Sequence, residues 1–330
     1  MTAAVVETTN SPFVLRQIAR PEPGDGQVLV RIEASGTNPL DAKIRAGEAA
    51  HAEQPLPAIL GMDLAGTIVA IGPGVENFGI GDAVFGLTGG VGGLQGSQAE
   101  FAAVDARLLA HKPNALTMRE ASVLPLVVIT AWEGLIDRAN LQRGQTVLIQ
   151  GGGGGVGHVA VQIALARGAR VFATALGDDL AYVRALGATP IDGSRDPADY
   201  VAEHTGGRGF DLVYDTIGGP VLDASFRAVK RFGHVVSCLG WGTHKLAPLS
   251  FKQATYSGVF TLYTLLANEG RAHFGEILKL VGALVETGEL SPRLDPRTFA
   301  MAEIGSAYDA VLGRNGAARP QGKIAITIAP

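Results

Sequence analysis

Apolar residues change their spacing twice along the chain, and these changes divide it into three parts. Up to about residue 120, short alternating or apolar stretches are broken by Gly, Pro and Asp, which predicts a β-rich lobe with few helices. Strands are predicted there at Gln27–Glu33, Gly66–Gly72 and Gly81–Gly86. From Leu124, strand and helix patterns alternate, as in a doubly wound parallel sheet. Beyond about residue 266, the pattern predicts only the amphipathic helix Phe274–Glu286 and a closing strand at 323–328.

The middle part is organised around one glycine-rich stretch, residues 147–162. Val147–Ile149 is typical of a strand buried on both faces, whereas apolar residues recur at helical spacing from Val156. Between these segments, glycines fit the G-x-G-x-x-G spacing, which lets the backbone turn sharply and approach a pyrophosphate without interference from a Cβ atom. The N–H groups at the helix start then stabilise the negative charge of the phosphates. Flexible linkers, the alternative, are polar and structureless on both sides, so we predict a dinucleotide site formed by Gly152, Gly154, Gly155, Val156 and Gly157.

The other elements of the middle part follow from shorter signals. Further strands are predicted at 170–175, 210–215 and 233–239. Pro220 suits the first residue of a helix, and an earlier helix has Asp178 as its N-cap and Gly187 at its end. The apolar stretch Tyr256–Leu266 is predicted as the last strand of the sheet. Because an exposed apolar edge strand invites pairing, we expect a homodimer formed through this strand.

Composition and charge exclude several kinds of partner. With 330 residues, the chain is long enough for two domains. A net charge of −4 gives no field for nucleic acid or an anionic membrane, and no apolar run reaches the ~18 residues of a membrane-spanning helix. The opening residues lack a basic segment followed by an apolar core, so we expect a cytoplasmic protein. Cys238 is the only cysteine, which excludes an internal disulfide and a thiolate zinc cage and leaves a small hydrophobe as its expected role.

The order of the parts, a β-rich lobe followed by a dinucleotide fold and a returning strand, resembles the medium-chain dehydrogenase/reductase family. Within this family the chain resembles the zinc-independent quinone oxidoreductases related to zeta-crystallin. The matching segments, spread over nearly the whole chain, are Thr37–Asp41, Ile44–Gly47, Gly61–Gly66, Gly81–Asp82, Leu124–Pro125 with Thr130–Ala131, Gly151–Gly157 with Gln162, Asp215–Gly219 and Gly322–Ile324. The resemblance implies an α/β fold with a β-rich GroES-like domain at 1–122 with 267–330 and a Rossmann domain, a doubly wound parallel sheet, at 123–266.

The resemblance also implies where the cofactor and the acceptor bind. Asn38 and Thr130 would line the nicotinamide end of the site, with Asn38 offering a neutral amide donor to the acceptor. From the residues alone, Asn38 is equally well explained as a turn before a proline, and Thr130 as a hydroxyl at a helix start. Thr174, Arg195 and Cys238 complete the expected cofactor contacts.

Two positions that carry zinc ligands in related dehydrogenases are changed here. Zinc-dependent alcohol dehydrogenases of this family carry a Cys after a Gly-x pair and a Gly-His-Glu motif, whereas this sequence has Asn38 and Gly61–Asp63 there. Catalytic zinc needs three N, S or charged O ligands, which an Asn, a Met and one Asp do not supply. His158, His204 and His234 are expected to be solvent-facing or hydrogen-bonded residues. We therefore predict no metal.

The second strand of the sheet indicates the cofactor. An NAD-preferring fold usually has an acidic residue at the end of this strand to hold the ribose hydroxyls, but here the strand ends Ala173-Thr174-Ala175, which favours NADPH. The next loop, Leu176–Leu180, lacks the lysine of the resembling family and contains two acids that would repel a 2′-phosphate. Either Asp178 and Asp179 turn away as helix caps, which we prefer, or the enzyme is poorly selective. Arg195 is then the best remaining cation.

Without a metal, the favoured acceptors are those that need little charge stabilisation on oxygen. Hydride addition to a quinone or an enone delocalises charge into a conjugated carbonyl, which hydrogen bonds can hold. We therefore expect an NADPH-dependent quinone or enone oxidoreductase, with a 2-enoyl thioester reductase and a non-catalytic NADPH-binding sensor or scaffold as alternatives. The tyrosine that many relatives place after the Arg-x-Gly segment is missing. Glu48 or His51 could replace it, and His51 is the preferred candidate proton donor, with bulk water as the default.

Overall fold

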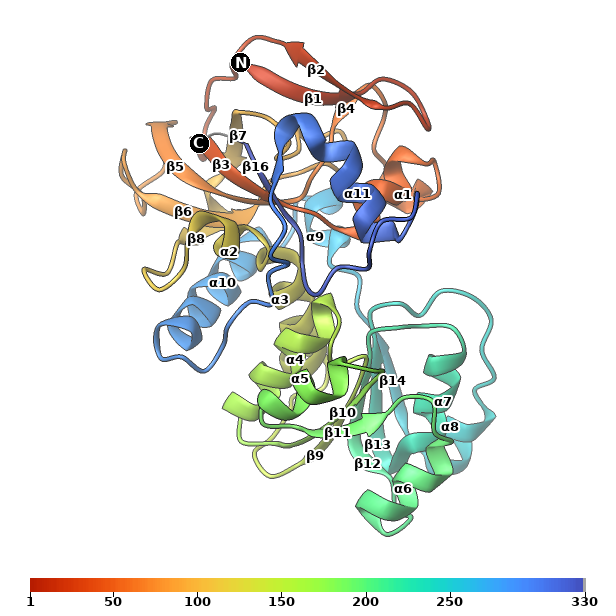
Figure 1. The fold of residues 1–330 in the computed structure, drawn as a ribbon. Coiled ribbons are helices and arrows are strands. Elements are labelled where there is room, and N and C mark those ends of the chain that lie inside the picture. The colour runs from red at the N-terminus through yellow and green to blue at the C-terminus, as the bar shows by residue number, and fades with distance from the viewer. Residues whose placement is uncertain (329–330) are drawn as a thin grey trace. The chain divides into compact units, whose positions relative to one another are not determined.

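The computed structural model describes residues 1–328, and Figure 1 shows its helices and strands. The chain forms two compact units. Unit 1 contains Met1–Leu126, Thr261–Gly288 and the residues from Pro292 onward, and unit 2 contains Val127–Phe260 with Glu289–Ser291. The domain ranges expected from the sequence, 1–122 with 267–330 and 123–266, stay a prediction.

Unit 1 is the predicted β-rich lobe. Its larger sheet has the order β15-β16-β3-β5-β6-β8 with β7 paired to β3, and its smaller sheet has the order β2-β1-β4. The strands of the larger sheet are β3 (Gln27–Gly36), β5 (Asp63–Ile71), β6 (Ala83–Leu87), β7 (Phe101–Asp105), β8 (Leu109–His111), β15 (Phe299–Ala300) and β16 (Ala325–Thr327), and those of the smaller are β1 (Thr2–Val6), β2 (Phe13–Gln17) and β4 (Ala58–Ile59). The helices associated with these sheets are α1 (Pro39–Arg45), α2 (Met118–Ser122), α9 (Leu262–Ala267), α10 (Arg271–Glu286) and α11 (Ile304–Leu312), with the short 3-10 turns η1 (Ala50–Ala52), η2 (Ala106–Leu108) and η4 (Met301–Glu303).

The closing strand of the chain pairs with a strand of unit 1. β16 pairs antiparallel with β3, so Ile326 lies opposite Ser35. Alternating apolar residues of β3, including Val30 and Ile32, are fully buried against Ile68 and Ile326. The last segment of the chain therefore completes the core that the first hundred residues begin.

Two predictions about the end of the chain are wrong. The stretch from Tyr256 is not one long strand, because β14 (Thr255–Gly258) ends at Gly258 and α9 begins at Leu262. The helix α11 was not predicted beyond residue 266. Its buried face follows helical spacing, but small and charged residues between the apolar positions hide that period in the sequence.

Unit 2 is the predicted doubly wound sheet. Its six strands are all parallel, in the order β11-β10-β9-β12-β13-β14. They are β9 (Thr146–Gln150), β10 (Arg170–Ala175), β11 (Thr189–Asp192), β12 (Phe210–Asp215), β13 (Val229–Ser237) and β14. The helices of this unit are α3 (Pro125–Trp132) with the following π-helical turn Glu133–Arg138, α4 (Gly155–Ala166), α5 (Asp179–Ala185), α6 (Pro197–Thr205), α7 (Pro220–Ala228) and α8 (Ala247–Lys252).

The order of strands in unit 2 places a ligand site at β9. The chain runs outward from β9 through β10 to β11, then returns to start again at β12 on the other side of β9. Ligands of open parallel sheets bind at such a reversal, beyond the carboxyl ends of the strands. Val147, Leu148 and Ile149 of β9 are fully buried, as a central parallel strand requires.

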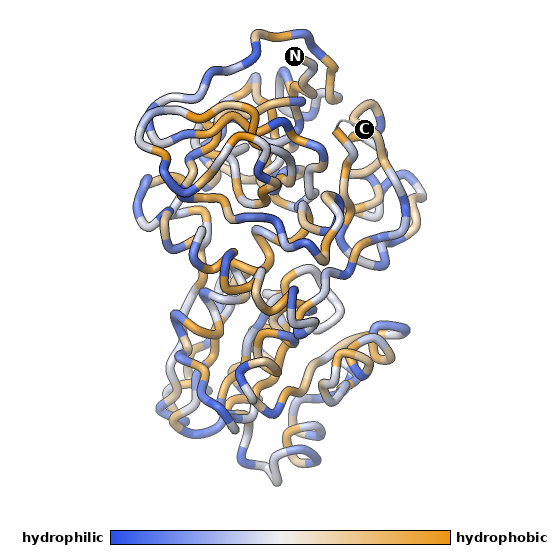
Figure 2. The backbone as a smooth tube through the Cα atoms, turned by 90° about the vertical axis from the view of Figure 1, so that its left-hand side faces the viewer, coloured by the Kyte–Doolittle hydropathy of each residue, from blue (hydrophilic) through white to orange (hydrophobic). Residues whose placement is uncertain are grey.

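Hydropathy follows this architecture. Figure 2 shows apolar and polar stretches alternating along the chain in both units. Across residues 1–328, the helices are all too short or too polar to cross a lipid bilayer.

Candidate functional site

The glycine-rich turn joins the central strand of unit 2 to its first long helix. β9 ends at Gln150, Gly154 is the N-cap of α4, and Gly151 has a φ of +80°, a conformation that favours glycine. Two backbone donors fix the turn to β10: Gly151 N–H donates to Thr174 Oγ1 at 3.0 Å, and Gly152 N–H donates to Thr174 O at 2.8 Å. The Thr174 hydroxyl in turn donates to Gln150 Oε1 at 2.8 Å. The loop is therefore held rigidly at the carboxyl end of two adjacent strands.

A different close neighbour explains why each motif position is a glycine. A Cβ atom at Gly157 would lie 2.7 Å from the carbonyl carbon of Gly151 and closer still to its oxygen, so the helix could not pack against the loop. A Cβ at Gly152 would lie 2.6 Å from that of Ala173. A Cβ at Gly154 would make a close contact of 3.3 Å with Gly151 O, and Gly154 itself is exposed to solvent. The first turn of α4 thus has an accessible backbone, which fits the pyrophosphate of a dinucleotide.

The structure brings the predicted glycine-loop residues together and places Thr174 beneath them. Gly155 and Val156 form the first turn of α4 and are half-buried. Thr174 is buried and uses its hydroxyl within the loop, so it braces the turn. Direct contact of these residues with a cofactor stays a prediction.

Other predicted cofactor residues of unit 2 lie in different surroundings. Thr130 belongs to α3, and its carbonyl oxygen accepts a hydrogen bond of 2.7 Å from the Tyr214 hydroxyl. Cys238 follows β13, and burial raises the pKa of its thiol to about 12, which suits the expected small hydrophobe. Arg195 follows β11 and pairs with Glu203 at 2.7 Å on the protein surface. Their contacts with a cofactor stay predictions.

The prediction for the two acids after β10 holds only in part. Asp178 is the N-cap residue of α5, as predicted, but its side chain makes no capping hydrogen bond. Asp179 lies inside the helix, and its carboxyl group packs on the glycine loop, where a Cβ added to Gly153 would meet Asp179 Cγ at 2.6 Å. The expectation that the acids turn away as caps is therefore wrong for Asp179.

In unit 1, Asn38 stands at the centre of a buried polar network. It precedes α1, and only 2% of its surface is exposed. Its Oδ1 accepts a hydrogen bond from the Lys323 ammonium, and its Nδ2 donates to Asp63 Oδ2 at 2.9 Å. Lys323 also donates to Thr37 O at 2.6 Å and lies 3.8 Å from Asp63. The Asn38 amide is thus held in one orientation by a cation on one side and a carboxylate on the other.

A second part of this network surrounds Asp41. The Asp41 Oδ2 atom accepts hydrogen bonds of 2.9 Å from both the Asn38 N–H and the Tyr308 hydroxyl. Gln98 donates to the same hydroxyl. Sequence reasoning missed Tyr308 and Gln98, which come from segments far from Asp41 and carry no local motif.

Burial shifts the ionisation of the network. Loss of solvent raises the pKa of Asp41 to about 7, despite the hydrogen bonds from Asn38 and Tyr308 that lower it. Burial also raises the pKa of Asp63, with Lys323 acting in the opposite direction. The pKa of Lys323 is lowered because its ammonium is buried, although Asp63 and Asp41 favour the charged form.

The residues at the family's zinc positions do not fit a metal. Lys323 bonds to Asn38 Oδ1, and the two Asp63 oxygens accept hydrogen bonds from the Asn38 amide and the Leu126 N–H, so the oxygen donors are already engaged within the chain. Met62 is fully buried and offers only a thioether, a ligand that zinc rarely uses. Within residues 1–328, no three His, Cys, Asp or Glu side chains are grouped so as to hold a metal ion.

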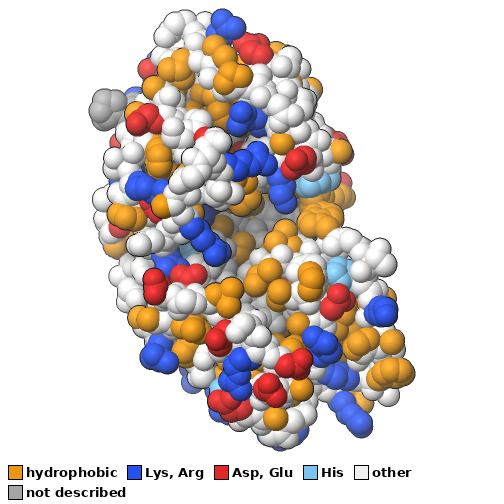
Figure 3. Space-filling view, turned by 45° about the vertical axis from the view of Figure 1, so that its right-hand side comes forward, with side chains coloured by type: hydrophobic (Ala, Val, Ile, Leu, Met, Phe, Trp, Pro, Cys, Tyr) orange, Lys and Arg blue, Asp and Glu red, His pale blue; other side chains and the backbone are white. Residues whose placement is uncertain are grey.

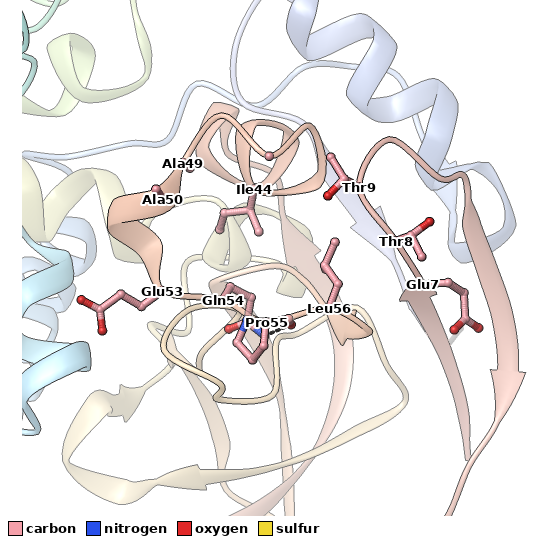
Figure 4. A pocket seen from close by; sticks show the side chains of 11 residues that line it. Glu7, Thr8, Thr9, Ile44, Ala49, Ala50, Glu53, Gln54, Pro55 and Leu56 are labelled. Carbon is pink, nitrogen blue, oxygen red and sulfur yellow. Dashed lines mark hydrogen bonds between the residues drawn. The ribbon is translucent and has the colours of Figure 1, made fainter.

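A pocket of about 700 Å³ opens in unit 1 beside the segment that carries His51 (Figure 4). The turn after β1, the end of α1 and the residues around η1 form it. Ile44 and Leu56 line it with apolar surface, and Glu7 and Glu53 add carboxylates. His51 itself is exposed in η1 and is not among the lining residues. Its role as a proton donor stays a prediction.

Surface charge agrees with the small net charge of the chain. On the face shown in Figure 3, Lys and Arg side chains are interspersed with Asp and Glu. Such mixed charge does not form the basic stripe of a nucleic-acid-binding surface.

Comparison with known proteins identifies the family. Residues 24–114 match the alcohol dehydrogenase GroES-like domain, and residues 155–282 match the zinc-binding dehydrogenase family. The chain is 32% identical over 299 residues, 88% of this chain and 70% of the relative, to an NADPH-dependent alkenal/one oxidoreductase of Arabidopsis thaliana. It is 81% identical to an alcohol dehydrogenase superfamily protein from Novosphingobium aromaticivorans, with a TM-score of 0.99 and all of both chains covered. A quinone oxidoreductase from Coxiella burnetii is 27% identical with a TM-score of 0.83, over 100% of this chain and 99% of that one. The chain belongs to the medium-chain dehydrogenase/reductase superfamily, in its zinc-independent, quinone oxidoreductase-like branch.

Proposed function

We propose that the protein is an NADPH-dependent, metal-free oxidoreductase that reduces α,β-unsaturated carbonyl compounds or quinones. The observation that carries the proposal is the glycine turn at the strand reversal of unit 2, where the N-cap Gly154 is exposed at the start of α4. The related alkenal/one oxidoreductase supports both the cofactor and the class of acceptor. The NADPH cofactor supplies a hydride when bound.

The residues of this chain hold and orient the reactants. Backbone N–H groups from Gly154 to Gly157 would bind the pyrophosphate, since no basic side chain is needed at a helix start. Thr130 is the proposed contact of the nicotinamide. Asn38 is proposed to act through its amide, which has one hydrogen beyond the one it gives to Asp63. The Lys323 ammonium bonded to Asn38 Oδ1 polarises this amide and makes it a better donor.

The class of acceptor follows from the absence of suitable zinc ligands at Asn38 and Met62. Reduction of an isolated ketone needs strong stabilisation of a developing alkoxide, worth several kcal/mol from a metal. An enone or a quinone spreads that charge over a conjugated system, and a neutral amide donor is then sufficient. The enolate that forms from an enone must be protonated, and His51 or solvent is proposed to supply that proton.

A panel of acceptors tests the proposal. The purified protein is assayed with NADPH and with quinones, enones and enoyl thioesters, following the loss of reduced-nicotinamide absorbance. Turnover of enones or quinones is expected. Preferred turnover of enoyl thioesters would show a 2-enoyl thioester reductase, and binding of NADPH without turnover of any acceptor would show a sensor or scaffold.

The proton donor is tested by replacing His51 with Ala and assaying enones and quinones in parallel. A hydroquinone takes up protons readily from solvent, whereas a carbon-centred enolate benefits from a positioned acid. A fall in turnover on enones alone would establish His51 as the acid. Unchanged rates on both acceptors would leave solvent as the donor.

We also propose that the protein is a homodimer joined through β14 and located in the cytoplasm. β14 is an edge strand of the sheet and carries the exposed Tyr256, and two further aromatic side chains, Phe260 just after it and Trp241, are exposed as well, Trp241 with 53% of its surface. Trp241 and Phe260 pack edge to face with their ring centroids 5.9 Å apart. Light scattering at micromolar concentration should give twice the chain mass of 34.1 kDa, and a monomer would contradict the proposal of a homodimer.

The proposed cytoplasmic location agrees with the single cysteine, which suits a reducing compartment, and cell fractionation can test it.

A further inference from the structure

The carboxyl group of Asp179 packs against the glycine-rich loop that follows β9. Asp179 is the first residue of α5 and follows β10, whereas Gly153 belongs to the loop that follows β9. A Cβ atom placed on Gly153 would lie 2.6 Å from Asp179 Cγ and 2.7 Å from its Oδ2. The carboxylate therefore reaches back from the helix and covers the middle of the glycine loop.

In this fold the ribose of the adenosine half lies between the first two strands, and an acidic side chain there binds its hydroxyl groups. The usual place for that acid is the end of the second strand, where this chain has Ala175. Asp179 brings a carboxylate to the same loop from four residues further along the chain. A sequence scan of the strand end alone would miss it.

We propose that Asp179 sets the cofactor specificity of this protein, accepting hydrogen bonds from the ribose hydroxyls of NADH and repelling the 2′-phosphate of NADPH. The protein then uses NADH as a second cofactor beside NADPH. This inference rests on the proposed function, because it concerns the same dinucleotide site.

The surrounding charges point the same way. The loop Leu176–Leu180 contains two aspartates and no Lys or Arg. Arg195, after the neighbouring strand, already pairs with Glu203 at 2.7 Å. A 2′-phosphate carries a charge of about −1.5 to −2 and binds best to a bidentate arginine. Here the Arg195–Glu203 pair is neutral as a whole, so Asp178 and Asp179 leave a net negative charge near the phosphate.

The test separates the charge of Asp179 from its shape. Asp179→Asn keeps the size of the side chain and an oxygen acceptor but removes the charge. Asp178→Asn is the matched control, because Asp178 is the adjacent carboxylate and makes no capping hydrogen bond. Dissociation constants for NADP⁺ and NAD⁺ are measured by calorimetry on the three proteins, and kcat/KM is measured with NADPH and NADH.

For the wild type we expect the two dissociation constants to lie within about tenfold of each other, since one ionic contact is worth roughly that factor. Asp179→Asn should shift the ratio toward NADP⁺ by about tenfold or more, and Asp178→Asn by less than about threefold. High salt should reduce the shift, because the repulsion is electrostatic.

Three results would overturn the inference. One is a wild type that binds NADP⁺ more than about a hundredfold more tightly than NAD⁺, a measurement that needs no variant. Another is an Asp179→Asn protein that binds both nucleotides with an unchanged ratio. Failure of the wild type to bind either nucleotide would overturn the proposed function and this inference with it, whereas the first two results leave the proposed function standing.

Discussion

The buried carboxyl group of Asp41 makes the stability of unit 1 depend on pH. Its side chain is fully buried, and Oδ2 accepts hydrogen bonds of 2.9 Å from the Asn38 N–H and the Tyr308 hydroxyl. The other oxygen, Oδ1, has no hydrogen-bond partner within the described residues. A carboxylate in this position leaves charge on an unsolvated atom, whereas the protonated form does not. Replacing Asp41 with Asn should therefore remove a penalty that grows as the pH rises.

The size and sign follow from the pKa of Asp41, which burial raises from 3.8 to about 7. Between these two pH values the folded protein binds one proton that the unfolded chain has lost. Stability is thus fully present below pH 3.8 and is lost as the pH rises through 7, with a slope near 1.4 kcal/mol for each pH unit. Over the whole interval the loss approaches about 4 kcal/mol, a large share of the stability of a typical domain.

Hydrogen exchange measured by mass spectrometry can follow this effect in unit 1. Exchange of peptides from β3 is recorded between about pH 5 and pH 8, corrected for intrinsic rates, in the wild type and in Asp41→Asn. Asp25→Asn is the matched control, because Asp25 is an exposed carboxyl of the same unit. Both tryptophans, Trp132 and Trp241, belong to unit 2, so their fluorescence during unfolding serves as an internal reference.

The protection of β3 should fall with rising pH in the wild type and in Asp25→Asn, and should fall much less in Asp41→Asn. Parallel profiles for the wild type and Asp41→Asn would refute the reasoning. They would mean that Asp41 is ionised in the folded protein with an ordinary pKa, stabilised by groups other than those in contact with it.

Three further changes test other parts of the structure. Gly157→Ala places a Cβ 2.7 Å from the Gly151 carbonyl carbon, so we expect NADPH to bind at least about tenfold more weakly and the melting temperature to fall. Gly305→Ala, a change in open space on a helix, is the control and should leave NADPH binding and the melting temperature unchanged or slightly improved. Lys323→Met leaves the buried Asp63 carboxylate without its positive partner and should lower the unfolding free energy by about 3–5 kcal/mol. Adding Asp63→Asn to this variant should recover part of the loss, and additive effects of the two substitutions would contradict this. Exhaustive chelation should change neither turnover nor melting temperature, and elemental analysis that finds one zinc per chain would count against the metal-free proposal.

Local patterns were enough to predict the parallel sheet. The strands Arg170–Ala175 and Phe210–Asp215 have the predicted bounds, and α7 begins at Pro220. In each case a short apolar run is bounded by residues with strong conformational preferences, so the information lies within about ten residues. The glycine turn was predictable for the same reason.

What the sequence could not show depends on contacts between distant segments. The resemblance points to Asn38 as a site residue, but the amide of Asn38 is oriented by Lys323, 285 positions away. Asp179 was expected to cap a helix, and its packing on Gly153 depends on how β9 and β10 lie side by side. Neither contact has a period or a motif, because each is made only when the sheets assemble.

The position of Lys323 also explains how this chain keeps a buried polar network without zinc. By the resemblance, Asn38 and Met62 stand where zinc-dependent relatives carry metal ligands, and the neighbouring Asp63 is a buried carboxylate that needs a compensating charge. Here the ammonium of Lys323 is bonded to Asn38 and lies 3.8 Å from Asp63, so one positive charge balances the carboxylate from within the chain. A monovalent ammonium cannot take an oxygen of the acceptor into its coordination shell as a metal does. In the proposed mechanism it can only strengthen the amide that it touches, so we expect the site to accept only compounds whose own conjugation carries most of the developing charge.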